Sequence, residues 1–202
     1  MHHRANALLA GVGFLILSCA QKSIAPTSFS PAYKSMLEPS EVSLVKSCAV
    51  ASSVVAKNGL PGSVVGKRTL EGGAVAPQPI SLTGDPTGWV RSAAREIFRQ
   101  SGVRTTTAGA PVVTLSLYQV LINENVHVNA GYDARVVIDA TVLDGQGRTC
   151  WSERKTGTAQ NYGHHGSAEA YRETVDHALD RALMSVAADG GFQEALCTRC
   201  SK

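Results

Sequence analysis

The sequence has no clustered stripe of lysine and arginine and no nucleic-acid recognition motif, although its formal net charge is +3. A basic patch is the electrostatic footprint by which proteins bind nucleic acid. Its absence argues against a nucleic-acid partner.

Catalytic signatures are also missing from the chain. The acidic residues and the histidine of the second half follow no hydrolase or triad pattern, and two serines lack the sequence of a nucleophile elbow. These residues are Asp139, Asp144, Glu153, Asp176, His177, Ser116 and Ser167. Such residues are typical of a solvated strand face or helix surface, so we expect no enzymatic activity and no cofactor.

No metal-ligand spacing such as His-Glu-x-x-His is present. His164 and His165 could join a cysteine or His177 in a metal site, but adjacent side chains point apart. We interpret residues 163–166 as a polar loop and expect no bound metal.

A long apolar run occurs only at the beginning of the chain. Residues 7–17 carry no charge and follow Arg4, which is the layout of a secretory signal. A membrane-spanning helix needs roughly 20 residues, so this run is too short to remain as a span. We expect residues 1–18 to be a signal peptide that is removed.

Ile16-Leu17-Ser18-Cys19 resembles the lipobox of bacterial lipoproteins. The resemblance implies cleavage between Ser18 and Cys19, diacylglycerol on the thiol of Cys19, and usually a further acyl chain, such as palmitate, on the freed amine. One acyl chain holds a protein only marginally, whereas two or more hold it stably. The alternative is an ordinary signal cut after Ser18 or Ala20, with Cys19 incidental.

Ala20 follows the lipidated cysteine at the position where lipoproteins retained in the inner membrane typically carry aspartate. By resemblance to that sorting rule, we expect a protein anchored in the outer membrane and facing the periplasm. Residues 19–40 contain three prolines among polar residues and predict a flexible tether, with a folded N-terminal arm as the alternative. Residues 41–191 then form a single domain, and residues 192–202 a C-terminal tail.

Four cysteines remain once Cys19 carries lipid, and an even number in an oxidising compartment predicts disulfides. They are Cys48, Cys150, Cys197 and Cys200. Sequence does not choose among the three pairings; we favour Cys48 or Cys150 bonded to the C-terminal pair, because a bond that closes a long loop restricts the unfolded chain most. Cys197 and Cys200 also have the spacing of a redox pair, but they follow the last expected helix instead of beginning one.

Two amphipathic helices are predicted from the spacing of apolar residues. Asp85 can cap the first, whose apolar stripe continues until Gly102, and Ser167 can cap the second, which Gly190 and Gly191 end. Trp89 in the first helix is expected in the core, as is Trp151 elsewhere.

Strands are predicted on both sides of the first helix. Before it, short strands broken by glycine and proline occupy the region from Glu41 to Thr83. After it, residues 111–123 alternate as a half-buried strand, residues 123–125 form a turn or a bulge, and residues 134–143 form the best-defined strand. Residues 144–147 turn the chain back into a return strand from Arg148 towards Ala159.

This order predicts an α+β fold in which an antiparallel sheet of about five strands carries both helices on one face. Hairpin-linked strands argue against a wound parallel sheet.

The portion from Trp89 to about Leu196 resembles the YajG-like lipoproteins and, more distantly, PelC-type and transport-auxiliary envelope lipoproteins. The likeness is carried by a helix that ends in Arg99-Gln100-Ser101-Gly102, by the strand at residues 112–117, by the strand at residues 134–143 with its Asp-Gly turn, and by the closing helix. It implies an outer-membrane lipoprotein without known catalytic chemistry, whose relatives are accessory or ring-forming parts of envelope machinery. The cysteines and residues 48–85 depart from the family pattern.

Two functions of different class follow. The first is a non-catalytic interaction module that docks on an envelope protein, or on copies of itself, through strand edges. The second is a periplasmic lipoprotein that binds a lipid or glycan in the cleft between helix and sheet.

Overall fold

The structure is a computed structural model that describes residues 27–37, 39–42, 44–70, 76–106, 109–125, 131–161 and 167–200. The expected signal peptide, Cys19 and the pair His164 and His165 lie outside these residues.

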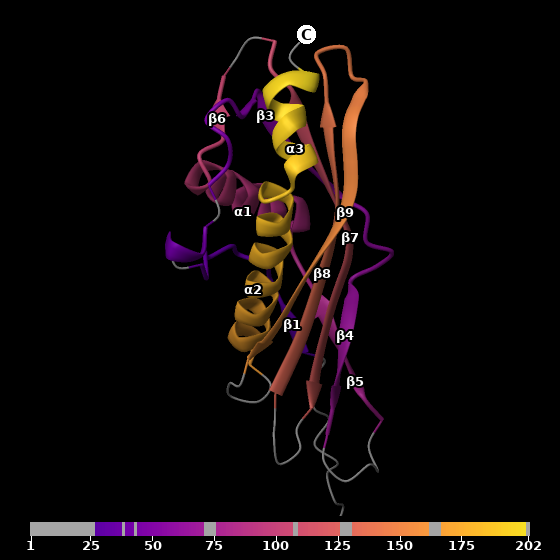
Figure 1. Ribbon diagram of the computed structural model, residues 1–202. Helices are drawn as coiled ribbons and strands as arrows, with labels where there is room; N and C mark the ends of the chain where they lie inside the picture. Colours follow the sequence, from indigo (N-terminus) through magenta and orange to yellow (C-terminus); the bar gives the residue numbers. More distant parts are fainter. Residues whose placement is uncertain are drawn as a thin grey trace, which may run out of the picture.

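One large mixed sheet and two long helices form two layers, with both helices on the same face of the sheet (Figure 1). A separate parallel pair of short strands joins residues 50–51 to residues 104–105. The strands are β1 (Thr27–Phe29), β2 (Val50–Ala51), β3 (Ser53–Asn58), β4 (Val64–Thr69), β5 (Gln78–Leu82), β6 (Arg104–Thr105), β7 (Val112–Asn125), β8 (Gly131–Leu143) and β9 (Thr149–Asn161). The helices are η1 (Pro39–Glu41), α1 (Pro86–Gln100), α2 (Ala168–Ala187), α3 (Gly190–Glu194) and the π-helical turn η2 (Ala195–Arg199). The α+β class predicted from the sequence is confirmed.

The sheet has seven strands in the order β1-β5-β4-β7-β8-β9, with β3 as a second partner of β7. Strands β7, β8 and β9 are antiparallel neighbours, as predicted. However, β3 and β4 each pair with β7 in parallel, and β1 pairs with β5 in parallel. The prediction of a purely antiparallel sheet of about five strands is therefore wrong, because α1 carries the chain back across the sheet between β5 and β7.

Strand β7 is long enough to have two partners in succession on one side. Its first half pairs with β3, from Val112 to Leu117, and its second half pairs with β4, from Ile122 to Asn125. The predicted turn or bulge at residues 123–125 is wrong, since these residues continue the ladder with β8. Glu124 can lie in the strand because its buried carboxylate accepts a hydrogen bond from Tyr171 and pairs with the guanidinium of Arg68.

We name the two ends of the molecule by the strand ends that lie there. The lower end in Figure 1 carries Thr69, Asn125, Gly131 and Asn161, where β4, β7, β8 and β9 meet. The upper end carries the hairpin between β8 and β9, together with α3. In that hairpin Asp144 accepts from the backbone N–H groups of Gln146 and Arg148, and Gly147 has a φ of +79°, as the predicted Asp-Gly turn requires.

Helix α1 begins and ends where the sequence predicts. The carboxylate of Asp85 accepts from the N–H groups of Thr87 and Gly88, and Pro86 occupies the first turn. The buried stripe of the helix runs from Trp89 to Phe98. Gly102, with a φ of +91°, follows the last turn.

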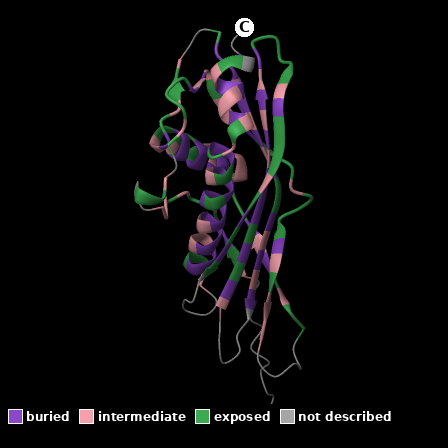
Figure 2. Ribbon diagram, viewed as in Figure 1, coloured by how far each residue is buried: buried purple, intermediate pink, exposed green. Residues whose placement is uncertain are grey.

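Helix α2 covers β8 and β9 and buries most of its inner face (Figure 2). Ser167 caps it through a hydrogen bond from the N–H of Ala170. At Gly157 of β9 the helix comes so close that a Cβ atom would lie 1.9 Å from the carbonyl oxygen of Ala178. Only glycine fits at this crossing, so α2 can lie directly against β9.

Part of the expected tether is folded. Residues 27–29 form β1, in which Phe29 is buried, and Tyr33 contacts α2. From Thr27 onward the chain is therefore an N-terminal arm, and a tether could only precede that residue. Residues 44–46 form no strand, and Leu44 is 79% exposed.

The expected C-terminal tail is also folded, as far as Cys200. Gly190 and Gly191 do not only follow α2 but begin α3, which Asp189 caps by accepting from the N–H of Phe192. Phe192 and Leu196 are fully buried. These apolar side chains pack on the core, so the domain includes residues 192–200.

Among the described residues, no helix is both long enough and apolar enough to cross a membrane.

We predict that Gly157→Ala destabilises the fold by about 2 kcal/mol or more, because overpacking of this kind typically costs 1–3 kcal/mol. Guanidinium unfolding measures the change. Gly145→Ala is the control, since nothing lies within 4 Å of a Cβ atom at Gly145. Equal stabilities for the two variants would contradict the close approach of α2 to β9.

Candidate functional site

Two disulfides join the C-terminal turn to distant parts of the chain. Cys48 is bonded to Cys197 and Cys150 to Cys200. The predicted disulfide bonds are thus present, and each connects an earlier cysteine with one of the C-terminal pair. Cys197 and Cys200 are not bonded to each other, so they do not form a redox pair.

A second feature is a pair of buried carboxylates on α2 that holds the N-terminal arm. Asp176 accepts from the backbone N–H of Lys34 at 3.3 Å and from the indole N–H of Trp89 at 2.6 Å. Asp180 accepts from the hydroxyl of Tyr33 and the backbone N–H of Met36, each at 2.9 Å. We call these two residues the arm clamp.

Burial sets the protonation of the arm clamp. Loss of solvent raises the pKa of Asp176 to about 6, against the lowering effect of its hydrogen bonds. Burial likewise raises the pKa of Asp180, and it raises the pKa of the Tyr33 hydroxyl. Perturbed carboxyl groups often mark active sites, but here their oxygens already bind the arm.

A third buried polar group lies beneath the first turns of α2. The hydroxyl of Tyr171 donates to Glu124, and the guanidinium of Arg68 lies 3.0 Å from the same carboxylate oxygen. Burial raises the pKa of the Tyr171 hydroxyl, and the neighbouring carboxylate adds to the effect. This network connects α2 with β4 and β7 and opens into none of the described hollows.

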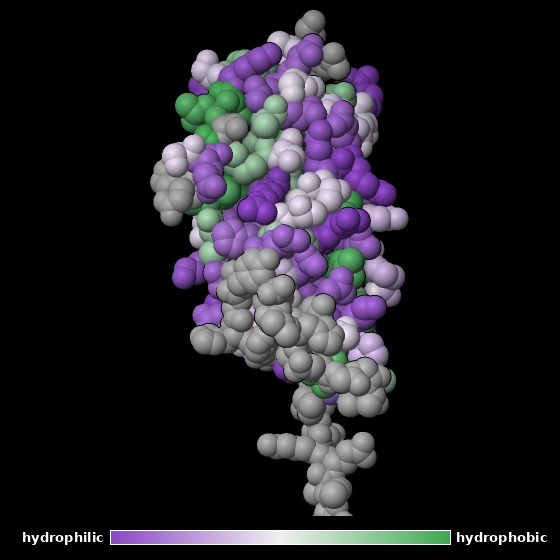
Figure 3. All heavy atoms as spheres, turned by 60° about the horizontal axis from the view of Figure 1, so that its bottom comes forward, coloured by the Kyte–Doolittle hydropathy of each residue, from purple (hydrophilic) through white to green (hydrophobic). Residues whose placement is uncertain are grey.

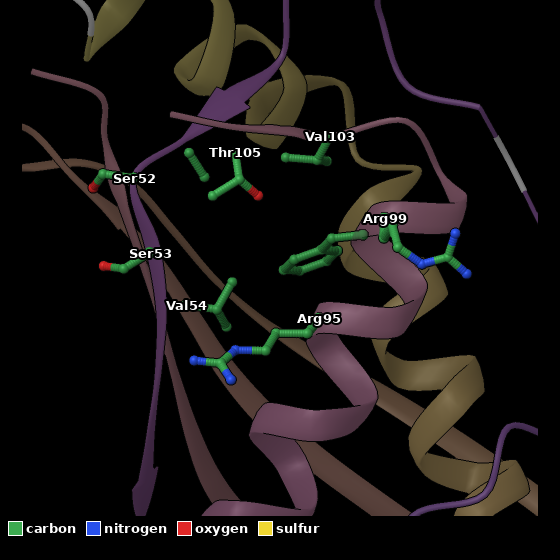
Figure 4. Close-up of a pocket in the computed structure, with 9 residues that line it drawn as sticks. Ser52, Ser53, Val54, Arg95, Arg99, Val103 and Thr105 are labelled. Carbon is green, nitrogen blue, oxygen red and sulfur yellow. The ribbon is translucent and has the colours of Figure 1, made fainter. Parts of the chain in front are cut away.

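A hollow of about 440 Å³ lies between β3, α1 and β6 in the upper half (Figure 4). We call it the edge hollow. Apolar atoms form most of its wall, and Phe98 of α1 and Val54 of β3 are among the residues that line it. Its lining residues are Ala51, Ser52, Ser53, Val54, Arg95, Phe98, Arg99, Val103 and Thr105.

The two arginines of the edge hollow differ in direction and pairing. Arg99 points away from it and pairs with Glu96 at 2.6 Å. Arg95 extends across the mouth towards β3, and within the described part of the chain it makes no ion pair. The hollow therefore presents one positive charge beside an apolar wall.

A second hollow, of about 600 Å³, lies where the loop after β3 passes β4 and β7. Tyr118 and Val64 line it and are 48% and 63% exposed. Arg154 lies 3.6 Å above the Tyr118 ring and binds Asp139 through two hydrogen bonds. The charges on this outer face of the sheet thus pair with each other.

The described residues that are visible at the lower end are mostly hydrophilic (Figure 3). Figure 3 brings this end forward, and hydrophilic residues cover most of the described surface there, with hydrophobic residues in small groups. Among the described residues, no three His, Cys, Asp or Glu side chains are close enough to hold a metal ion. His177, which was considered as a ligand, lies in α2, while His164 and His165 lie outside the described residues.

No protein-family model matches the sequence, and no curated protein matches it. A solved protein of Xanthomonas campestris from the family DUF330 is similar, with a TM-score of 0.51 and 13% identity over 80% of this chain and 92% of that one. This likeness shows a shared fold.

Two further solved structures have TM-scores below 0.5 and add nothing to the fold. A minor lipoprotein from Acinetobacter baumannii has a TM-score of 0.39 and 9% identity over 52% of this chain and 84% of that one. The PelC dodecamer from Paraburkholderia phytofirmans has a TM-score of 0.33 and 15% identity over 69% of this chain and 92% of that one. These likenesses do not single out the YajG-like group.

Of the residues singled out from the sequence, only the cysteines come together at one end of the molecule. Ser18 and Cys19, the expected cleavage and lipidation residues, lie outside the described residues. Sequence reasoning missed the arm clamp, although the spacing of Asp176 and Asp180 on an otherwise apolar helix face was a visible signal. It also missed the edge hollow, which depends on the parallel placement of β3.

We predict that replacing both Cys48 and Cys197 with alanine lowers the free energy of unfolding by about 2–5 kcal/mol, because the bond closes a loop of 149 residues. Guanidinium unfolding of the oxidised protein measures the loss. Peptide mapping without reduction should recover Cys48 linked to Cys197; a peptide that links Cys48 to Cys150 instead would show a different fold of the upper end.

We predict that the arm clamp makes stability fall as the pH rises from about 4 to about 6. The folded protein holds the proton of Asp176 more tightly than the unfolded chain does, since its pKa is raised from 3.8 to about 6. Asp176→Asn should remove a slope of at most about 1.4 kcal/mol per pH unit. Unfolding curves at a series of pH values measure it, with the exposed Asp133→Asn as control. An unchanged slope in Asp176→Asn would contradict the prediction.

Proposed function

We propose that this chain is a bacterial lipoprotein, anchored in the outer membrane by lipid on Cys19, whose domain is a non-catalytic interaction module of the cell envelope in the periplasm. The observation that carries the proposal is the lipobox-like Ile16-Leu17-Ser18-Cys19 directly after a short apolar run. The proposed partner is an envelope protein or further copies of the chain.

The disulfides support export of the domain. Four cysteines form two bonds that close the upper end. Disulfides persist in the bacterial periplasm and outside the cell, whereas cytosolic thiols are kept reduced. A chain with this pairing is suited to an oxidising compartment.

The arm gives the anchored domain an orientation. Seven residues lie between Cys19 and Thr27, and the eight steps from one Cα atom to the next span at most about 29 Å in an extended chain. Thr27 pairs with Ile80 near the lower end, and the arm clamp fixes the following residues to α2. Lipid on Cys19 would therefore hold the lower end towards the membrane.

The same geometry supports a role away from the membrane for the upper half. Ser53, at the edge hollow, pairs with Val112 of β7. Further along β7, Ile122 is connected to Thr27 of β1 across the ladders of β4 and β5. Ten residues of strand correspond to about 33 Å. The edge hollow would thus face the periplasm and be accessible to a partner.

The buried acids support a non-catalytic role. Asp176, Asp180 and Glu124 already accept hydrogen bonds from the arm, Trp89 and Tyr171, and Glu124 also pairs with Arg68. A general acid or base must reach a substrate atom within about 3 Å. These carboxylates bind parts of their own fold and face none of the described hollows.

A second candidate function is the binding of a lipid or glycan. The observation that favours it is the apolar wall of the edge hollow, whose volume lies within the range of about 300–1,000 Å³ typical of ligand pockets. A ligand that co-purifies with the domain in native mass spectrometry would favour this function over protein docking.

We predict that protein from the native host carries diacylglycerol on Cys19 and begins at that residue. Intact-mass and N-terminal peptide analysis of the membrane fraction measures both. Cys19→Ala should move the protein out of that fraction, while Cys48→Ala, which alters a cysteine of the domain, should leave the lipid in place. An unmodified chain that still sediments with the outer membrane would overturn the proposal.

A further inference from the structure

Strand β3 has a ladder partner on one side only. It pairs in parallel with β7, from Ser53 to Asn58, and within the described residues no other strand bonds to it. Strand β4, which takes the next place along β7, begins only at Val64. The upper half of the sheet therefore ends at an open strand of six residues.

The backbone of β3 faces the edge hollow at its first residues. Ser52 and Ser53 line the hollow, yet Figure 4 shows that both hydroxyl groups point away from it. The hydroxyl of Ser52 donates to the carbonyl oxygen of Pro111, on the β7 side. Ser52 precedes β3 and its backbone N–H also bonds to Pro111, so the main-chain groups open to an added strand begin at Ser53.

The side chains around this edge form a recognition surface. Val54 of β3 and Phe98 of α1 both line the hollow, and Arg95 reaches over its mouth (Figure 4). In a strand, residues two apart lie on the same face. A strand placed here could put an apolar side chain against Phe98 and, two residues later, an acidic side chain against Arg95.

We propose that the edge hollow binds an extended peptide segment of an envelope protein, which adds a strand to β3 and carries an apolar and an acidic residue two positions apart. Main-chain hydrogen bonds provide affinity in this mode of recognition, and pockets for alternate side chains provide specificity. The inference rests on the proposed function and names the partner class of its docking site.

The charges of the edge favour a different protein over a second copy of this chain. Lys57 is exposed on β3, and a lysine on an edge strand opposes pairing with an identical edge. Two copies joined along β3 would bring Lys57 and Arg95 of each close together. An acidic segment compensates these charges, whereas a second copy adds to them.

The test uses the full lipidated chain in detergent and a synthetic six-residue peptide. The peptide has valine and glutamate two positions apart and threonine elsewhere, with both ends blocked. Isothermal titration calorimetry measures its binding. Replacing glutamate with lysine in the peptide should weaken binding at least tenfold. Every second backbone N–H of a bound strand faces β3. Methylation of the nitrogens that face β3 should abolish binding, whereas methylation of the other nitrogens should leave binding within about twofold.

Two protein variants and a matched control locate the site. Arg95→Glu reverses the charge at the mouth, and Thr105→Trp fills the hollow from its exposed rim. Each should weaken peptide binding at least tenfold without a change in melting temperature. Arg91→Glu makes the same charge change one turn earlier on α1, outside the hollow, and should leave binding within about twofold.

Every other outcome overturns the proposal. No binding of the peptide, equal binding to Arg95→Glu, or equal binding after both methylations excludes strand addition at β3. A dimer that Thr105→Trp dissociates would assign the edge to a second copy, and a co-purifying small molecule in the hollow would assign it to a ligand. Lipidation is measured by the mass of the peptide that contains Cys19, whereas docking is measured by peptide binding. The proposed lipid anchor and the proposed docking site can therefore fail independently.

Discussion

The packing of α2 against the sheet is the constraint on which the rest of the structure depends. At Gly157 the helix backbone and the strand backbone are as close as a missing side chain allows, and α2 buries Tyr171, Leu179 and Leu183 in the same layer. Such an approach maximises contact between the helix and two long strands. It also fixes the rotation of α2, and hence the direction in which its polar residues point.

Both ends of the described chain depend on that rotation. The rotation of α2 directs the polar side chains of Asp176 and Asp180 towards the N-terminal arm. Tyr171 turns towards Glu124 beneath the first turns of the helix. After α2, Phe192 packs against Phe98 and Trp151, so the C-terminal turn reaches Cys48 and Cys150. The helix thereby organises the arm, the core and the disulfides together.

The elements with strong local signals could be predicted from the sequence. Asp85 and Ser167 are helix caps, and Asp144 to Gly147 form a tight hairpin, because each depends on neighbours within four residues. The parallel pairs could not be predicted, because a crossover connection brings β3 and β7 together and the spacing of apolar residues carries no information about such a connection. Residues 123–125 looked like a turn because their burial depends on Tyr171 and Arg68, which are distant in sequence. The edge hollow was missed for the same reason. The lipobox, in contrast, is a local sequence pattern that can be recognised without knowledge of the fold.

The bond between Cys48 and Cys197 also has a mechanical consequence. It makes the residues between them a covalent ring, so tension between the two ends of the chain passes from Cys48 directly to Cys197 and bypasses the strands. Load on the N-terminus would first break the pairing of β1 with β5, and then the bonds of the arm to Asp176 and Asp180. A protein tethered by its N-terminus could extend by the length of that arm under load while its folded core stayed intact.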